Sequence, residues 1–177
     1  MLVVRKASLD EADIILEMYN RIIDDTDGKV PSPKWTKGVY PDYNCVFEAI
    51  KKGEMYVALS DGIVAGALIR NHKMAPGYDE IEWDVKAPDE EIFVIHTMGV
   101  SPDFQHKGIA SKLAEAVAEE GRRSGIKAIR LDVIDENYPP MKLFEKCGYK
   151  NHGQHILRYY GMTNTSFTLM ELKLCVN

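Results

Sequence analysis

The amino-acid sequence predicts a mixed α/β fold. Strand-like and helix-like stretches alternate along its 177 residues, apolar residues make up 45% of the chain, and no repeat, linker or low-complexity run divides it. A chain of this length and composition is typical of one globular domain that buries a core without a metal or disulfide. We therefore expect residues 1–177 to form a single domain.

The first half of the chain is expected to hold two helices and three strands. Ser8 and Glu11 match a capping box, so the first helix should begin near Ser8. Apolar residues at helical spacing follow it, and Asp24 to Gly28 ends the pattern. Proline and aromatic residues mark 29–41 as a loop, and the second helix is predicted over 42–52. The strands, of which the last two are joined by a Ser-Asp-Gly turn, are expected at 2–5, 55–59 and 63–69.

The second half is expected to alternate strands and helices. Residues 92–100 form a nearly continuous apolar run, as expected for a strand that is buried on both faces. A helix over 108–124, a strand over 128–134 and a short helix ending at Cys147 should follow. The last predicted elements are two strands around a Gly-Met-Thr-Asn turn, near 155–160 and 167–174.

The charge is mildly acidic and concentrated in one stretch. The chain has 22 Lys and Arg against 27 Asp and Glu, a net charge of −5. Residues 78–91 hold seven acids and one base, Lys86, and the rest of the chain is nearly neutral. Such a chain is poorly suited to bind a nucleic-acid backbone, and we expect no nucleic-acid partner. The acidic stretch is an edge strand or an extended loop, and it either attracts a cationic amine or is simply solvated.

The cysteines and the hydropathy pattern indicate where the protein resides. Cys45, Cys147 and Cys175 are odd in number, far apart and show no C-x-x-C spacing. This pattern disfavours a metal site or a disulfide framework and is typical of a reducing compartment. No apolar run is long enough for a signal peptide or a membrane span. We therefore expect a cytoplasmic protein with no metal and no membrane partner.

The stretch most informative about function is 92–113, which reads as a buried strand, a Pro-bearing turn and a helix start. The helix start has the sequence Gln-His-Lys-Gly-Ile-Ala at 105–110. A helix start has free backbone N–H groups and a partial positive charge, which together can bind an anion. Gly108 would let the anion approach the backbone, and Lys107 would add positive charge. An ordinary turn, in which Gly108 only permits the backbone conformation, is the equal alternative. The motifs of nucleoside triphosphate and dinucleotide binding are missing.

Residues 105–110 resemble the Q/R-x-x-G-x-G/A signature of the GCN5-related N-acetyltransferase (GNAT) family. The resemblance continues upstream at 100–102, and downstream at Asn137 and 143–149, which are similar to the family's N…L-Y-E-K-x-G-F element. It is close over 92–150 and loose over the rest of the chain. It implies a mixed, mostly antiparallel seven-stranded sheet that is splayed between its fourth and fifth strands, with helices on both faces.

The family uses acetyl-CoA as cosubstrate and no metal, and the resemblance implies which residues would bind it. The helix start would cradle the pyrophosphate, while strand backbone would align the pantetheine arm and polarise the thioester carbonyl. The cofactor-binding residues implied in this way are Met98, Gly99, Val100, Gln105, His106, Lys107, Gly108, Ile109, Ala110, Asn137 and Phe144. Gly99 either forms a bulge or makes room for a bulky neighbour, and Asn137 either contacts the pantetheine or caps the next helix.

Two positions bear on the chemistry. Phe144 stands where many relatives carry a Tyr that protonates the departing thiolate, and Phe cannot donate a proton. Activity does not require this donor, because a thiol with a pKa of about 8.5 is a tolerable leaving group even when it leaves as the thiolate. His96 shares a strand face with Met98 and Val100 and matches a His of the arylalkylamine acetyltransferases. It is the candidate base, or water-positioning residue, for the acceptor amine. A histidine that is merely hydrogen-bonded in the core is the alternative.

The sequence thus predicts an N-acetyltransferase that moves an acetyl group from acetyl-CoA to a primary amine by direct attack in a ternary complex. The amine belongs to a small molecule or a peptide, and a homodimer through the closing strands is common in the family. The alternatives are the same fold with another acyl-CoA or acceptor, and a non-catalytic acetyl-CoA-binding sensor, which the absence of a Tyr at 144 would suit.

Overall fold

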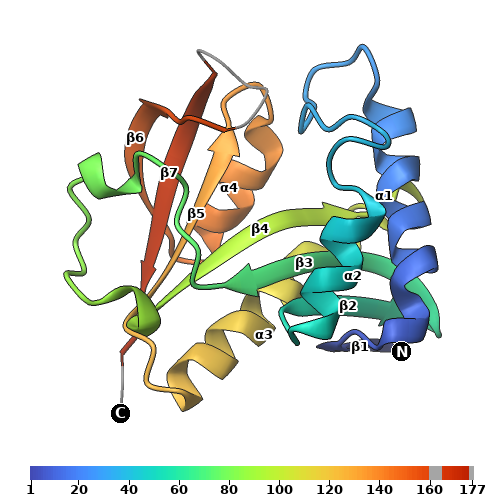
Figure 1. The fold of residues 1–177 in the computed structure, drawn as a ribbon, viewed down its shortest axis with the longest axis horizontal. Coiled ribbons are helices and arrows are strands. Elements are labelled where there is room, and N and C mark those ends of the chain that lie inside the picture. Colours follow the sequence, from blue (N-terminus) through green and yellow to red (C-terminus); the bar gives the residue numbers. More distant parts are fainter. Residues whose placement is uncertain (160–164, 176–177) are drawn as a thin grey trace. The chain divides into compact units, whose positions relative to one another are not determined.

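The structure, a computed structural model, describes residues 1–159 and 165–175. Its strands are β1 (Leu2–Lys6), β2 (Met55–Ser60), β3 (Ile63–Asn71), β4 (Ile92–Val100), β5 (Ala128–Ile134), β6 (Lys150–Ile156) and β7 (Ser166–Lys173). Its α-helices are α1 (Ala12–Thr26), α2 (Tyr43–Lys51), α3 (Ile109–Arg123) and α4 (Tyr138–Lys146) (Figure 1). No helix among the described residues has the length and apolar content needed to cross a bilayer.

The strands form a seven-stranded sheet in the order β1-β2-β3-β4-β5-β7-β6. Strand β4 pairs with β5 in parallel. Antiparallel pairs join β1 to β2, β2 to β3, β5 to β7 and β7 to β6. The β4–β5 register covers only Ile92–Val94 against Ala128–Arg130, although both strands continue beyond it. The predicted fold class, a mixed α/β fold with a mostly antiparallel seven-stranded sheet, is confirmed.

The chain divides into two compact units, and each unit combines two separate stretches of sequence. The first comprises Met1–Arg70 and His96–Val117, and the second comprises Asn71–Ile95 and Ala118–Asn177. Strand β4 and helix α3 therefore each contribute residues to both units.

In the first unit, helices cover both faces of the strands. The apolar sides of α1 and α2 pack on β2 and β3 in a core that comprises Ala12, Ile15, Met18, Tyr19, Ile22, Val46, Ala49, Ile50, Met55, Val57, Val64, Ala67 and Ile69. On the opposite face of β3, a Cβ at Gly66 would lie 2.9 Å from the Ile109 Cγ2 atom and 3.3 Å from the Leu113 Cδ1 atom. The start of α3 thus approaches β3 as closely as a glycine allows.

Helix α1 begins as the sequence predicts. The Ser8 N–H donates to the Glu11 carboxylate at 2.9 Å, and a short 3₁₀ turn over Leu9–Glu11 leads into the helix. Arg5 of β1 donates two hydrogen bonds to the same carboxylate at 2.7 and 2.8 Å. These bonds from Arg5, aided by Ser8, lower the pKa of Glu11 to about 2. Glu11 therefore links the start of α1 to the neighbouring strand.

This linkage predicts a pH-dependent stability. An acid with a lowered folded-state pKa stabilises the fold above its unfolded value of about 4.3, and this contribution is lost as the pH falls through about 2. Because the ion pair is partly exposed to solvent, we expect Glu11→Gln to lower the free energy of unfolding by about 1 kcal/mol at pH 7. Urea unfolding of both proteins should show the difference narrowing between pH 5 and pH 2. A difference that is independent of pH would contradict this role.

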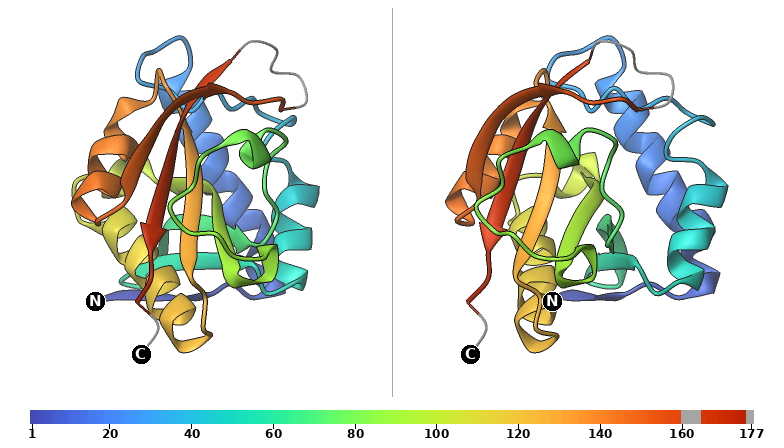
Figure 2. Two further views of the ribbon diagram at one scale, coloured as in Figure 1. Left: turned by 90° about the vertical axis from the view of Figure 1, so that its left-hand side faces the viewer. Right: turned by 60° about the vertical axis from the view of Figure 1, so that its left-hand side comes forward.

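In the second unit, the segment 71–91 lies over β5 and β7, and α4 lies on the opposite face of these strands (Figure 2). The acidic stretch is a loop with 3₁₀ turns at Tyr78–Glu80 and Asp89–Glu91, which resolves the choice between an edge strand and a loop. Its apolar residues are buried in a core that comprises Ala75, Tyr78, Ile81, Trp83, Val94, Ile134, Leu157, Phe167 and Leu169. The stretch is therefore a packed segment rather than a wholly solvated one.

One predicted strand is wrong in position. Strand β6 occupies Lys150–Ile156, whereas a strand was expected near 155–160. β6 is an edge strand at the end of the sheet, and five of its seven residues are exposed, so it lacks the apolar run by which strands are recognised. The turn predicted at 161–164 lies outside the described residues.

Candidate active site

The part of β4 that belongs to the first unit has an irregular backbone at Thr97. Its φ is +48°, a left-handed conformation that is strained for a β-branched residue. The Thr97 carbonyl accepts a hydrogen bond of 2.8 Å from the hydroxyl of Tyr19, which is fully buried on α1. Burial raises the pKa of Tyr19, so this hydroxyl remains a donor. A left-handed residue within a strand interrupts the regular ladder, as a β-bulge does, and such strain is concentrated at functional sites.

Neighbouring side chains of α1 and the backbone of β3 approach β4 closely at Gly99. A Cβ at Gly99 would lie 2.8 Å from Ile22 Cδ1 and 3.2 Å from Tyr19 Cε1, while the Gly99 carbonyl oxygen would lie 2.9 Å from a Cβ at Gly66. Of the two alternatives for Gly99, the structure thus favours room for bulky neighbours, and the irregularity lies at Thr97 instead. The backbone of β4 is fixed between α1 and β3.

The candidate base lies on the more accessible face of this strand. His96, Met98 and Val100 are half-buried, whereas Thr97 and Gly99 between them are buried. This alternation agrees with the prediction that the three residues share one face. His96 is neither sealed in the core nor fully exposed, which suits a residue that exchanges a proton with a ligand.

The connection from β4 to α3 is anchored at its beginning and open at its end. Ser101 is buried, and its N–H donates to the Ala65 carbonyl at 2.9 Å. Gly108 has a φ of +75°, and a Cβ on it would meet no atom within 4 Å. The Lys112 N–H donates to the Gly108 carbonyl at 3.1 Å, so helical bonding begins at Gly108. The first amides of α3 therefore have no acceptor within the helix and lie beside an open approach.

The side chains around this opening are polar. Residues 105–108 are exposed, whereas Ile109 is 3% exposed and anchors the helix start. The Lys107 ammonium donates to the Asp103 carbonyl at 3.0 Å and lies 4.8 Å from the centre of the Phe104 ring. The helix-start amides, the unhindered glycine and the nearby Lys107 ammonium are features that a phosphate site would need, so a phosphate site at 105–110 stays a prediction.

The second unit holds the other two residues implied for the cofactor. Asn137 occupies the position before α4, and its side chain makes no capping hydrogen bond to the helix. Phe144 is 3% exposed and packs edge-on against Tyr149, with 5.0 Å between ring centres. The residues implied for binding therefore divide between the units, with His96, Met98–Val100 and 105–110 in the first and Asn137 and Phe144 in the second.

Asp132 in β5 is a candidate functional residue that no sequence motif indicates. Its Oδ2 atom accepts hydrogen bonds from two tyrosine hydroxyls, Tyr78 at 2.7 Å and Tyr159 at 2.6 Å. Burial raises the pKa of Asp132, and the two hydrogen bonds partly oppose that rise. A half-buried residue whose carboxyl has a raised pKa is a candidate acid–base group. The one signal in the sequence was an acid inside an otherwise mostly apolar strand.

A family model described as the Acetyltransferase (GNAT) family matches residues 16–149. The chain belongs to this family and is an acyltransferase by membership. It is 30% identical over 86 residues to "Probable N-acetyltransferase camello" of Xenopus laevis. That alignment covers 49% of this chain and only 39% of the relative, so the chain matches well under half of the relative's length.

Solved structures share the fold at low sequence identity. An N-acetyltransferase from Staphylococcus aureus Mu50 superposes with a TM-score of 0.71 at 18% identity, over 99% of each chain. The YncA protein of Salmonella typhimurium, solved with its cofactor acetyl-CoA, gives a TM-score of 0.71 at 17% identity, over 99% of this chain and 95% of that one. The fold of this chain is thus shared with solved proteins that are described as acetyltransferases.

Proposed function

We propose that the protein transfers an acetyl group from acetyl-CoA to a primary amine, which attacks the thioester directly in a ternary complex. The observation that carries this proposal is the start of α3, where helical bonding begins at a left-handed glycine with an open approach. Membership in the GNAT family supports acetyl transfer, and the name of the Xenopus laevis relative supports an amine acceptor.

The residues present fit the cosubstrate in the first unit. Bound acetyl-CoA would supply an activated acyl group as its thioester. The first amides of α3 and the Lys107 ammonium would bind the pyrophosphate. The backbone of Met98–Val100 would align the pantetheine arm and stabilise charge on the thioester oxygen. The left-handed conformation of Thr97 supports this role, because backbone strain of this kind is concentrated at functional sites.

The acceptor amine must lose a proton before it can attack. His96 is the proposed base or water-positioning residue, because it is half-buried on the same face as Met98 and Val100. Asp132 of the second unit is the second candidate, favoured by its raised pKa and by the two tyrosine hydroxyls that donate to its carboxylate. In the second unit, Asn137 would contact the pantetheine arm and Phe144 would pack beside the thioester without donating a proton.

Gly108 provides the test of the cofactor site. We expect Gly108→Glu to weaken acetyl-CoA binding at least tenfold, about 1.4 kcal/mol, because it places bulk and negative charge where the pyrophosphate approaches. Gly125, beyond the other end of α3, is a matched control, since it has a φ of +76° and open space around a Cβ. Titration calorimetry should show near-normal affinity for Gly125→Glu. Unchanged affinity in folded Gly108→Glu, or an equal loss in both variants, would refute the cofactor site.

Phe144 provides a second test, which concerns the leaving group. We expect Phe144→Tyr to keep the fold and to preserve or raise turnover, because the new hydroxyl restores a donor near the departing sulfur. Tyr149→Phe is a matched control, since it removes from the ring beside Phe144 a buried hydroxyl that has no hydrogen-bond partner in the part of the chain that the structure describes. Steady-state thiol release would measure both. A large fall in turnover for Phe144→Tyr would mean that this position does not face the thioester.

The alternatives differ in what they release and accept. A non-catalytic acetyl-CoA-binding sensor would bind acetyl-CoA without releasing thiol, and a protein with another acyl donor would turn over only with that donor. Thiol release with acetyl-CoA and a panel of polyamines, amino acids, arylalkylamines, aminoglycosides and peptides separates these cases. A cytoplasmic location, a small-molecule or peptide amine as partner, and a homodimer remain predictions.

A further inference from the structure

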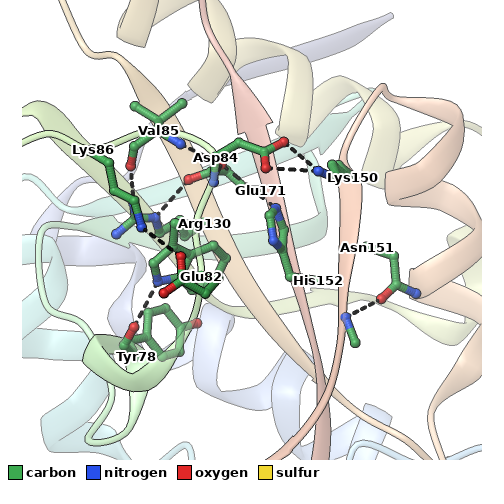
Figure 3. A network of polar contacts seen from close by, with 12 residues as sticks. Tyr78, Glu82, Asp84, Val85, Lys86, Arg130, Lys150, Asn151, His152 and Glu171 are labelled. Atoms are coloured by element: carbon green, nitrogen blue, oxygen red, sulfur yellow. Dashed lines mark hydrogen bonds and ion pairs between the residues drawn. The ribbon is translucent and has the colours of Figure 1, made fainter.

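Three side chains from distant parts of the sequence converge in the second unit, beside β6 and β7 (Figure 3). They are Asp84 of the segment 71–91, His152 of β6 and Glu171 of β7. One nitrogen or oxygen atom from each lies within 4.8 Å of the corresponding atoms of the other two. The cluster belongs to no step of the proposed transfer reaction.

His152 is the unusual member of this cluster. Its side chain is only 6% exposed, and its buried Nε2 atom has no hydrogen-bond partner among residues 1–159 and 165–175. That atom lies 3.8 Å from Glu171 Oε2, and the ring packs against Trp83 with 5.1 Å between ring centres. Buried polar atoms normally have partners, so a ring nitrogen held toward two carboxylates indicates a place for a cation.

We propose that Asp84, His152 and Glu171 bind a divalent transition-metal ion of the zinc class. One imidazole nitrogen with two carboxylate oxygens suits zinc, whereas calcium and magnesium prefer oxygen ligands alone. Tetrahedral zinc with bonds near 2.1 Å places its donor atoms about 3.4 Å apart. The Nε2–Oε2 distance of 3.8 Å requires a small adjustment, and Asp84 is exposed enough to complete the set.

Two cationic side chains, Lys150 and Arg130, already contact the carboxylates of this cluster, and a metal would have to displace Lys150. The Lys150 ammonium donates to both Asp84 oxygens, at 2.8 and 2.7 Å, but the Lys150 side chain is 61% exposed and can turn to solvent. The buried Arg130 guanidinium binds Glu171 Oε1 at 3.0 Å, and this bond leaves Oε2 on the side of His152. Oε2 also accepts backbone N–H bonds of 3.0 and 3.1 Å from Asp84 and Val85, so these amides would shift on binding.

Lys150 therefore competes with the metal for Asp84, and its removal should strengthen metal binding. The expectation of no metal rests on the cysteine spacing and on the family resemblance, and neither concerns a histidine and two acids that lie far apart in the sequence. A bound ion would tie the segment 71–91 to β6 and β7, and its role would be structural.

Calorimetric titration of the tag-free full-length chain with zinc sulfate tests the site. We expect one zinc ion per chain, at least tenfold weaker binding by His152→Ala, and severalfold tighter binding by Lys150→Met. His155→Ala on the same strand and Lys146→Met on α4 are matched controls that should bind zinc as the wild type does. Magnesium should not bind. Zinc binding that survives His152→Ala, or no binding by either the wild type or Lys150→Met, would overturn the proposal.

A spectroscopic readout covers the case in which His152→Ala loosens the fold. In the unmodified chain, zinc should move the ¹⁵N resonance of His152 Nε2 and leave that of His155 in place. Asp84→Asn, at an exposed position, should reduce this response at equal zinc concentration. If His152 responds to pH but not to zinc, the cluster holds a proton and the metal site is refuted.

Discussion

Replacing His96 with alanine is expected to lower turnover by about 10² to 10⁴-fold, the usual cost of removing a general base, and to leave acetyl-CoA affinity near its normal value. The two effects should separate, because the proposed cofactor contacts in the first unit are the backbone of Met98–Val100, the first amides of α3 and the Lys107 ammonium, and the His96 side chain is not among them. An ordinary imidazole loses its proton near pH 6.5, and only the neutral form accepts a proton from the amine. The rate should therefore fall on the acidic side.

The pH–rate profile separates the base from a core histidine. If His96 is the base, the acidic limb of the pH–rate profile should disappear or move in His96→Ala. The control variant His72→Ala should keep the acidic limb of the wild type. Asp132→Asn tests the second candidate in the same assay, since the amide keeps the size of the side chain. An acidic limb that persists unaltered in His96→Ala, together with a lower melting temperature, would assign His96 to packing.

Arg130→Met is expected to lower the free energy of unfolding by about 3 to 5 kcal/mol, because it leaves Glu171 as a buried charge without its partner. The two side chains are only 6% and 2% exposed, and Arg130 Nε lies 3.0 Å from Glu171 Oε1. Arg130 also donates to the Val85 carbonyl at 2.7 Å and lies 4.4 Å above the Trp83 ring. Its loss should therefore release the segment 71–91 as well.

The double variant Arg130→Met/Glu171→Gln is the control. It removes both charges and keeps an oxygen for the backbone amides of Asp84 and Val85. Its cost should be smaller than the sum of the two single costs, as expected for partners in direct contact. Urea unfolding in the presence of a chelator keeps metal binding out of the comparison. Strictly additive costs would show that the pair is not coupled.

The sequence predicted best those elements that carry a local pattern. A pattern of a few residues was enough to predict three of them. These are the apolar run of β4, the capping box before α1 and the glycine at the start of α3. β6 was misplaced because its pairing with β7, rather than its own hydrophobicity, makes it a strand. The strained residue of β4 was also missed, because nothing in the sequence around Thr97 marks a left-handed conformation.

Long-range arrangements account for the rest of what the sequence did not predict. Asp132 is a candidate only because Tyr78 and Tyr159 meet it, 54 and 27 residues away along the chain. The cluster of Asp84, His152 and Glu171 likewise depends on three elements meeting. Such sites depend on tertiary contacts, and a single sequence without those contacts does not specify them.

The interleaving of the two units along the chain governs the order in which the protein can fold on the ribosome. The first unit needs His96–Val117 as well as Met1–Arg70, so it stays incomplete while the intervening residues are being synthesised. Domains generally fold as units during translation, and this one must wait until α3 has emerged. A nascent chain that stops before His96 leaves the face of β3 at Gly66 without Ile109 and Leu113. Premature termination should therefore yield an aggregation-prone fragment rather than a smaller folded domain.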